Sequence, residues 1–181
     1  MNNIWLIYLN KEESVGRRKR GSKISKELKF DLDLVKDTIL KSQDAKIYLG
    51  CDSVKIKRKR VKYATVIVIH FGAKNGCGRG AKVFGRIDYD EVKDAKASKP
   101  INRMLSEVNR IIEMYNLLED VLVERIDDVS IHVDINSDEQ FGSNVAYGAA
   151  LGMIKGMIGI TPCFKPLSFA ASFAADRYAN G

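Results

Sequence analysis

The apolar run at residues 63–71 constrains the fold more than any other feature of this sequence. Its residues, YATVIVIHF, are apolar at successive positions and therefore on both faces of a strand. A strand of this kind is typical of the centre of a sheet that is covered on both sides. We therefore predict a central strand here, with helices on both faces of the sheet.

Strand and helix patterns follow one another in an order that suits an α/β fold. Three strands come first, then helix, strand, helix, strand and helix, at residues 47–51, 63–71, 81–89, 100–118, 129–135, 143–157, 161–164 and 168–178. Strands in direct succession suit antiparallel hairpins, whereas strands joined through a helix are parallel and their connection is right-handed. If the fourth strand lies beside the first, the result is a mixed five-stranded sheet of order 3-2-1-4-5.

Local signals mark some of the element boundaries. Asp31 suits the positive end of a helix over residues 31–42, and Pro100 suits the first turn of the long helix. Ser143 is predicted to cap the next helix. Residues 4–9 fit either a short strand or an arm packed on the core.

Positive charge is concentrated in the first third of the chain. The net charge is +7, and residues 1–62 hold 17 Lys and Arg against 8 Asp and Glu, whereas the remainder holds 13 against 15. A local basic excess is typical of a surface that binds a polyanion such as nucleic acid. A solvated basic face is the alternative interpretation.

The length predicts a single domain. No apolar run is long enough to span a membrane, so no membrane partner is expected. The three cysteines are scattered and form no CxxC pair, which argues against a zinc site or a disulfide framework. A reducing, cytoplasmic location fits this usage best. The sequence leaves the oligomeric state open.

Two aspartates stand at the carboxyl ends of predicted strands. Asp52 follows the first strand, and Asp134 lies at the end of the fourth. These strands are predicted neighbours, so both carboxylates reach the edge of the sheet where the strand order reverses. Ligands of open α/β sheets bind at such a point.

Two further acids lie on apolar helix faces. Glu107 shares its face with Met104 and Ile111, and Asp176 follows Phe169 and Phe173 on the last helix. A carboxylate in such a place is either paired with Arg or Lys or bound to a metal ion. Converging carboxylates repel one another, and Mg²⁺ or Mn²⁺, which prefer oxygen ligands, reverse that balance. The predicted catalytic residues and ligands of two such ions are Asp52, Glu107, Asp134 and Asp176.

The basic run after Asp52 is predicted to form the tip of a hairpin beside these acids. Its cations suit the phosphates of a nucleic-acid backbone. The predicted nucleic-acid-binding residues are Lys55, Lys57, Arg58, Lys59, Arg60 and Lys165. Ser53 and His132 are predicted to contact the metal ligands and to help position them without binding the metal ions. A hydrogen bond within the turn is the alternative for Ser53, and a core position is the alternative for His132.

Several of these segments resemble the YkuK-like family of predicted ribonuclease H-like nucleases. They are GCDS at 50–53, IHVDIN at 131–136, SN at 143–144, KP at 165–166 and AASFAADRY at 170–178. The resemblance covers roughly residues 22–180 and implies a single ribonuclease H-like domain over residues 22–181. A basic extension over residues 1–21 lies outside it. The resemblance also implies that the four acids named above are the catalytic set. The family often has a glutamine after the Asp-Ser pair, where this chain has Val54.

These observations predict a metal-dependent nuclease that hydrolyses phosphodiester bonds by a two-metal mechanism. The RNA strand of an RNA–DNA hybrid, structured RNA and branched DNA all fit as substrates. A nucleic-acid-binding module without catalysis is the first alternative. A protein adaptor whose basic surface meets an acidic partner is the second.

Overall fold

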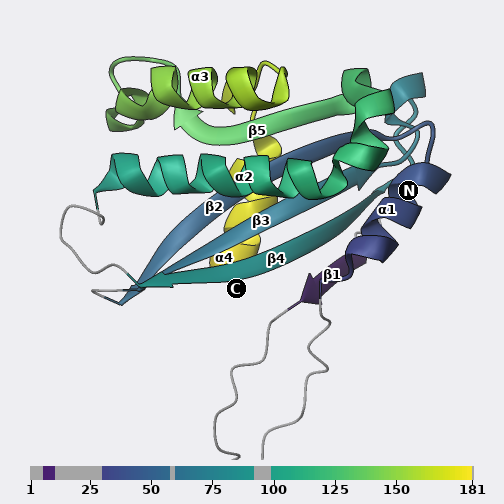
Figure 1. The fold of residues 1–181 in the computed structure, drawn as a ribbon, viewed down its shortest axis with the longest axis horizontal. Coiled ribbons are helices and arrows are strands. Elements are labelled where there is room, and N and C mark those ends of the chain that lie inside the picture. The colour runs from purple at the N-terminus through teal and green to yellow at the C-terminus, as the bar shows by residue number, and fades with distance from the viewer. Residues whose placement is uncertain (1–5, 11–29, 58–59, 92–98, 181) are drawn as a thin grey trace, which may run out of the picture.

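The computed structural model describes residues 6–10, 30–57, 60–91 and 99–180. They form a six-stranded mixed sheet with helices on both faces (Figure 1). In sheet order the strands are β1 (Leu6–Asn10), β4 (Ala81–Glu91), β3 (Arg60–His70), β2 (Lys46–Lys57), β5 (Val129–Asn136) and β6 (Cys163–Lys165). The α-helices are α1 (Leu32–Lys41), α2 (Pro100–Leu122), α3 (Tyr147–Ile158) and α4 (Asp176–Asn180), and a π-helical segment, η4 (Ala170–Ala175), leads into α4.

The predicted order of the five strands is confirmed, and one strand is added to it. Strands β4, β3 and β2 form antiparallel hairpins, β5 lies parallel to β2, and β6 lies parallel to β5. The added strand, β1, pairs in parallel with β4 at the outer edge of the sheet. Residues 6–10 are therefore a strand, which is one of the two alternatives that the sequence left open. Residues 1–5 and 11–21 of the predicted extension lie outside the described residues.

The strand that carries Asp52 is longer than predicted. We expected it to end at Cys51, but β2 continues to Lys57 because it pairs with β3 along almost its whole length. Its pairing with β5 on the other side stops earlier, at Cys51 opposite Val133. Asp52 therefore lies just beyond the end of the β2–β5 ladder, not at the end of its strand.

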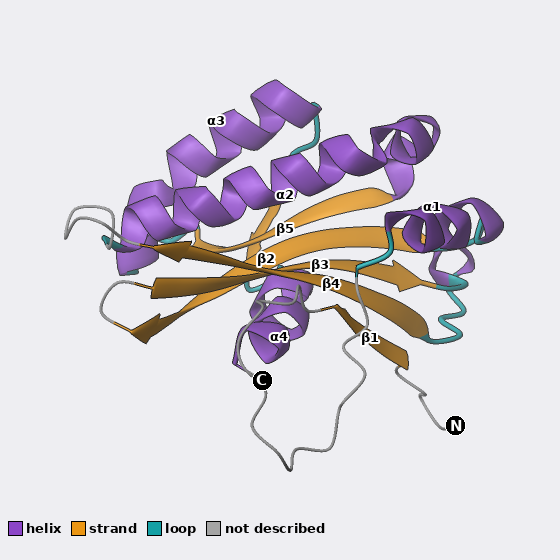
Figure 2. Ribbon diagram, turned by 60° about the horizontal axis from the view of Figure 1, so that its bottom comes forward, coloured by secondary structure: helices purple, strands orange, loops and turns teal. Residues whose placement is uncertain are grey.

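Different helices cover the two faces of the sheet. Figure 2 shows α1, α2 and α3 on one side and α4 on the other. Successive residues of a strand point to opposite faces. Leu49 and Ser53 therefore face α2, whereas Gly50 and Asp52 face η4 and α4.

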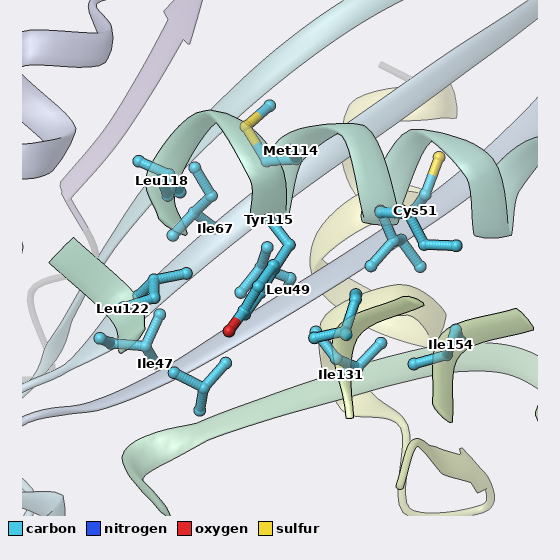
Figure 3. Close-up of a cluster of buried hydrophobic side chains, with 14 of the residues drawn as sticks. Ile47, Leu49, Cys51, Ile67, Met114, Tyr115, Leu118, Leu122, Ile131 and Ile154 are labelled. Carbon is cyan, nitrogen blue, oxygen red and sulfur yellow. The ribbon is translucent and has the colours of Figure 1, made fainter. Parts of the chain in front are cut away.

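Large aliphatic side chains fill the space between β2 and α2. Figure 3 shows Ile47 and Leu49 of β2 beside Met114, Leu118 and Leu122 of α2, and all five are fully buried. Each aliphatic side chain of this size stabilises the fold by about 1.5–3 kcal/mol when it leaves water. This face is the main core, and it holds α2 rigidly across the sheet.

Several predicted helix boundaries change in the structure. α2 extends past the predicted end because Val121 and Leu122 continue its buried stripe. Ser143 does not cap α3, which begins at Tyr147, because its hydroxyl instead accepts a hydrogen bond from the Asn136 backbone nitrogen at 3.0 Å. Among the described residues, no helix combines the length and the apolar character that crossing a membrane requires.

The last predicted helix is divided into η4 and α4. A π-helix has a wider turn than an α-helix and changes which residues share a face. Phe169, just before η4, packs with its ring centroid 4.8 Å from that of Tyr48, whereas Phe173 is 73% exposed. The prediction that both phenylalanines line one apolar face with Asp176 is therefore wrong.

Candidate metal centre and nucleic-acid interface

Asp52 and Asp134 meet where the β2–β5 ladder ends. Cys51 and Val133 are the last paired residues of the two strands, and each of the two aspartates is the next residue along its strand. Both are partly buried. The strand pairing therefore brings the two aspartates to the same end of the β2–β5 ladder, on neighbouring strands as the sequence predicted.

Asp176 joins this pair from the first residue of α4. A hydrogen bond links its side chain to that of Asp52. Burial is the largest cause that raises the pKa of Asp52, the charges of Asp134 and Asp176 add to it, and the result is about 6. The hydrogen bond from the Ser53 backbone acts in the opposite direction. Three of the four predicted acids therefore form one group on the η4 side of the sheet.

Glu107 reaches the same region from α2, on the other face of the sheet. Its side chain is 4% exposed, and the Ser53 hydroxyl donates a hydrogen bond to its Oε1 atom. Burial raises the pKa of Glu107 to about 8, and the charges of Asp52 and Asp134 contribute to the rise. The hydrogen bond from Ser53 and the charge of Arg103 oppose it. The charges of Asp52 and Asp134 therefore act on Glu107, although its hydrogen bond with Ser53 lies on the α2 side of the sheet.

Asp134 has two partners of its own. Its Oδ1 atom accepts a hydrogen bond from the Ser172 hydroxyl at 2.7 Å and forms an ion pair with Lys165 Nζ at 2.8 Å. Ser172 lies 3.2 Å from the Ser168 hydroxyl. Since Ser172 uses its proton on Asp134, the Ser168 hydroxyl donates to Ser172. η4 thus holds the Asp134 carboxylate through a relay of two serines.

Gly50 allows η4 to lie against the sheet at this point. A Cβ atom at Gly50 would lie 2.6 Å from the Ala171 backbone nitrogen and 2.7 Å from the Ala170 carbonyl carbon. These are backbone atoms, so no side-chain rotation could relieve the contact. Gly50 is therefore required for η4 to bring Ser172 and Asp176 close to β2 and β5.

His132 supports η4 rather than the carboxylates directly. Its Nδ1 atom accepts a hydrogen bond from the Ala170 backbone nitrogen at 3.1 Å. Its ring centroid lies 5.2 Å from that of Tyr48 and 4.8 Å from that of Phe169. Burial lowers the pKa of His132 to about 4, so the ring is neutral at pH 7. His132 is therefore a core histidine. It lies two residues before Asp134 on β5 and positions the backbone of η4.

The predicted basic tip is partly within the described residues. Lys55 and Arg60 are exposed, and the Arg60 guanidinium lies 4.4 Å from the centroid of the Tyr89 ring. Lys57 is the last residue of β2, so the tip is shorter than predicted. Arg58 and Lys59 lie outside the described residues. Lys165, which was predicted to contact a phosphate, forms an ion pair with Asp134 instead.

Sequence reasoning missed two contributors to the site. Ser172 gave no signal, because nothing in a sequence links it to an aspartate 38 residues away. Arg103 did give one, because it lies one helical turn before Glu107, and residues at that spacing share a helix face. Its charge lowers the pKa of Glu107.

The chemistry of these side chains suits a hard divalent cation. All four offer carboxylate oxygens, the donors that Mg²⁺ and Mn²⁺ prefer. Burial is the largest cause of the raised pKa values of Asp52 and Glu107, and the charges of neighbouring acids raise both further, so a bound cation would stabilise the ionised group. As the side chains stand, however, no three Asp, Glu, His or Cys residues in the described ranges are arranged to hold a metal ion. The donor set fits such an ion, although Lys165 forms an ion pair with one of its members, Asp134.

A family model described as Ribonuclease H-like matches residues 22–180, so the chain belongs to the ribonuclease H-like family. Neither a curated protein nor a solved structure matches the chain significantly. The ribonuclease H-like family that the motifs indicated is thereby confirmed. Membership fits the sheet order and suggests a role connected with nucleic acid. Strand β1 lies outside the matched residues.

Proposed function

We propose that this protein is a metal-dependent nuclease that hydrolyses phosphodiester bonds of a nucleic acid. The observation that supports the proposal best is the grouping of acids from four separate elements. Burial raises the pKa values of Asp52 and Glu107, and the charges of the neighbouring acids raise them further. Structural carboxylates usually have basic partners, and repulsion among unpaired ones is a cost that a cation removes. Perturbed pKa values of this kind cluster at functional sites.

Asp52, Glu107, Asp134 and Asp176 are the proposed metal ligands. Bound there, two Mg²⁺ or Mn²⁺ ions would activate a water molecule and stabilise the charge of the leaving oxygen. At pH 7 Glu107, whose pKa is about 8, must give up a proton to act as a ligand, whereas Asp52, whose pKa is about 6, is already mostly ionised. No side-chain nucleophile is needed.

Hydrogen bonds from neighbouring side chains would position these ligands. Ser53 donates to Glu107, and Ser172 donates to Asp134. Such partners fix the orientation of a carboxylate and commonly change metal affinity by about 10–100-fold when removed. In this proposal the two serines prepare the carboxylates for metal binding.

The basic hairpin would hold the nucleic-acid backbone beside these acids. Lys55 and Arg60 are exposed at the turn end of the β2–β3 hairpin, and Lys55 lies three residues beyond Asp52 along β2. Lys57, Arg58 and Lys59 complete the proposed surface. Phosphate contacts position a substrate but carry no sequence information, so an RNA–DNA hybrid, structured RNA and branched DNA all remain candidate substrates.

The direct test is cleavage of labelled RNA–DNA hybrid, duplex and four-way-junction substrates with Mg²⁺ or Mn²⁺. In Asp52→Asn we expect the cleavage rate to fall by roughly 100-fold or more, the scale seen when one electrostatic group of an active site is lost. Asp127→Asn is the matched control, because Asp127 is exposed and lies outside the acid group. Cleavage by Asp52→Asn at the wild-type rate would remove this assignment.

The ion pair between Lys165 and Asp134 favours a second candidate, a binding module without catalysis. An acid that a lysine neutralises permanently would not repel a phosphate backbone. Such a module would bind nucleic acid without divalent ions, and its affinity would fall steeply with salt as counterions are released. In that case Glu107→Gln would leave the affinity unchanged or raise it. A requirement for Mn²⁺ in binding or cleavage would exclude this candidate.

A further inference from the structure

Lys165 forms an ion pair with Asp134, one of the proposed metal ligands. Its Nζ atom lies 2.8 Å from Asp134 Oδ1, the same oxygen that accepts a hydrogen bond from Ser172. Within the described residues, this is the one ion pair formed by any of the four acids. The Lys165 side chain is 40% exposed, so its ammonium group can move into water without crossing the core.

We infer that Lys165 is an exchangeable counter-ion for Asp134, which neutralises this carboxylate until a divalent cation displaces it and thereby sets the affinity for that cation. The inference rests on the proposed function, since it assumes that Asp134 is a metal ligand. Ser172 keeps its hydrogen bond in both situations and holds the carboxylate in place. The displaced ammonium group then remains beside the site, where it can meet a phosphate.

The chemistry of lysine suits such an exchange. Its ammonium is a compact, strongly hydrated charge on a flexible stem, whereas arginine holds a carboxylate with a rigid two-pronged fork. A partly exposed pair of this kind is worth only about 0.2–1 kcal/mol, so breaking it costs little. A divalent ion that several carboxylates bind together gains more than that. Lys165 therefore lowers the metal affinity without preventing binding.

The position of Lys165 in the fold also favours exchange over a purely structural role. Lys165 is the last residue of the short edge strand β6, and its backbone pairs opposite Asn136 rather than Asp134. The ion pair is therefore made by the flexible side chain alone. Loss of the ammonium group leaves this strand pairing intact.

The test is Mn²⁺ binding by the whole protein without nucleic acid, measured by electron paramagnetic resonance of free Mn²⁺ and by calorimetry at pH 7. In Lys165→Met we expect Mn²⁺ to bind about five-fold more tightly than in the wild type, which is the free energy of the lost ion pair expressed as an affinity. In Lys165→Arg we expect affinity at or below the wild-type value. Lys155→Met, an exposed lysine on α3, is the matched control and should bind as the wild type does.

The outcomes separate the two proposals. Equal or weaker Mn²⁺ binding by a folded Lys165→Met, beside a wild type that binds Mn²⁺ and cleaves, would overturn the exchange and leave the nuclease proposal standing. Binding of Mn²⁺ by Lys165→Met but not by the wild type would overturn the exchange, because no ion would then displace Lys165 in the native chain, and it would favour the binding module. Absence of Mn²⁺ binding in every variant, each shown to be folded by its circular dichroism spectrum, would overturn both.

Discussion

The two faces of the sheet reach the same group of acids by different means. On the α2 face, large aliphatic side chains surround Glu107, which is buried and has a pKa of about 8. On the η4 face, Gly50 and the alanines of η4 let backbone approach backbone, and the partly buried Asp52 has a pKa of about 6. Burial among aliphatic side chains therefore shifts the pKa of Glu107 strongly. The close approach of η4 to the sheet groups the other three acids with polar partners.

This contrast explains why the site needs both faces. A helix held by aliphatic packing supplies one rigid carboxylate, but it cannot supply a hydrogen-bonding relay such as the one from Ser168 through Ser172 to Asp134. The short η4 segment can, because its backbone lies directly on Gly50. The predictions below test the comparison in order of decreasing expected effect.

The largest effect is expected from the buried acid on the α2 face. The pKa of Glu107 is about 8 in the folded protein, against an ordinary value of 4.5, so the folded state binds more protons than the unfolded state between these pH values. The free energy of unfolding in EDTA should therefore decrease as pH rises from about 5 to 8, on the order of 4 kcal/mol for this group alone. Urea denaturation at several pH values measures this decrease.

Glu107→Gln should remove most of that pH dependence, because glutamine has no proton to lose. Asp52 contributes in the same direction at lower pH, since its pKa of about 6 also lies above the ordinary value of 3.8. Glu124→Gln, at an exposed position, is the control and should keep the wild-type slope. A wild-type protein whose stability rises between pH 5 and 8 would contradict the contrast between the two faces.

The next effect is expected from the close approach on the η4 face. Gly50→Ala forces a methyl group against the backbone of Ala170 and Ala171, so we expect the free energy of unfolding to fall by about 3 kcal/mol. Gly152→Ala is the matched control, because a Cβ atom there meets nothing within 4 Å. That control should gain about 0.5–1 kcal/mol from better helix propensity. Equal effects of the two substitutions in urea denaturation would show that η4 does not depend on Gly50.

The smallest effect is expected from two phenylalanines at the start of the last helical segment, Phe169 just before η4 and Phe173 within it. Phe169→Ala removes ring contacts with Tyr48 and His132, so we expect a loss of about 2 kcal/mol for this half-buried side chain. Phe173→Ala should change the stability by less than about 0.5 kcal/mol, because its ring is exposed. Thermal unfolding of the pair checks the division of the last helix. A larger loss in Phe173→Ala would mean that the segment is an ordinary α-helix.

Sequence reasoning recovered most of the fold because the deciding signals are local. The two-faced apolar pattern of residues 63–71 identified the central strand β3, and the alternation of helix and strand led to the sheet order. It failed at the last helix, where Phe173 looked like part of an apolar face. The π-helical turn that exposes Phe173 lies against Gly50, which is far away in the chain.

The candidate site was predicted less completely than the fold. All four acids were singled out, because strand ends and apolar helix faces are visible in a sequence. The partners of those acids were not, since Ser172 and Lys165 meet Asp134 only through the packing of η4 and β6 beside β5. Lys165 was expected to meet a phosphate, and nothing in its neighbours along the chain indicated the ion pair.

The sequence by itself determined the order of strands and helices, the position of each acid along them and the basic character of the first 62 residues, because these follow from local patterns of polarity. The tertiary structure alone decided that β1 joins the sheet, that Glu107 is buried against Ser53 and that Lys165 neutralises Asp134. Those outcomes depend on distances between side chains that are remote in the chain. Folding sets such distances through the packing of the whole core, and no local pattern of residues encodes them.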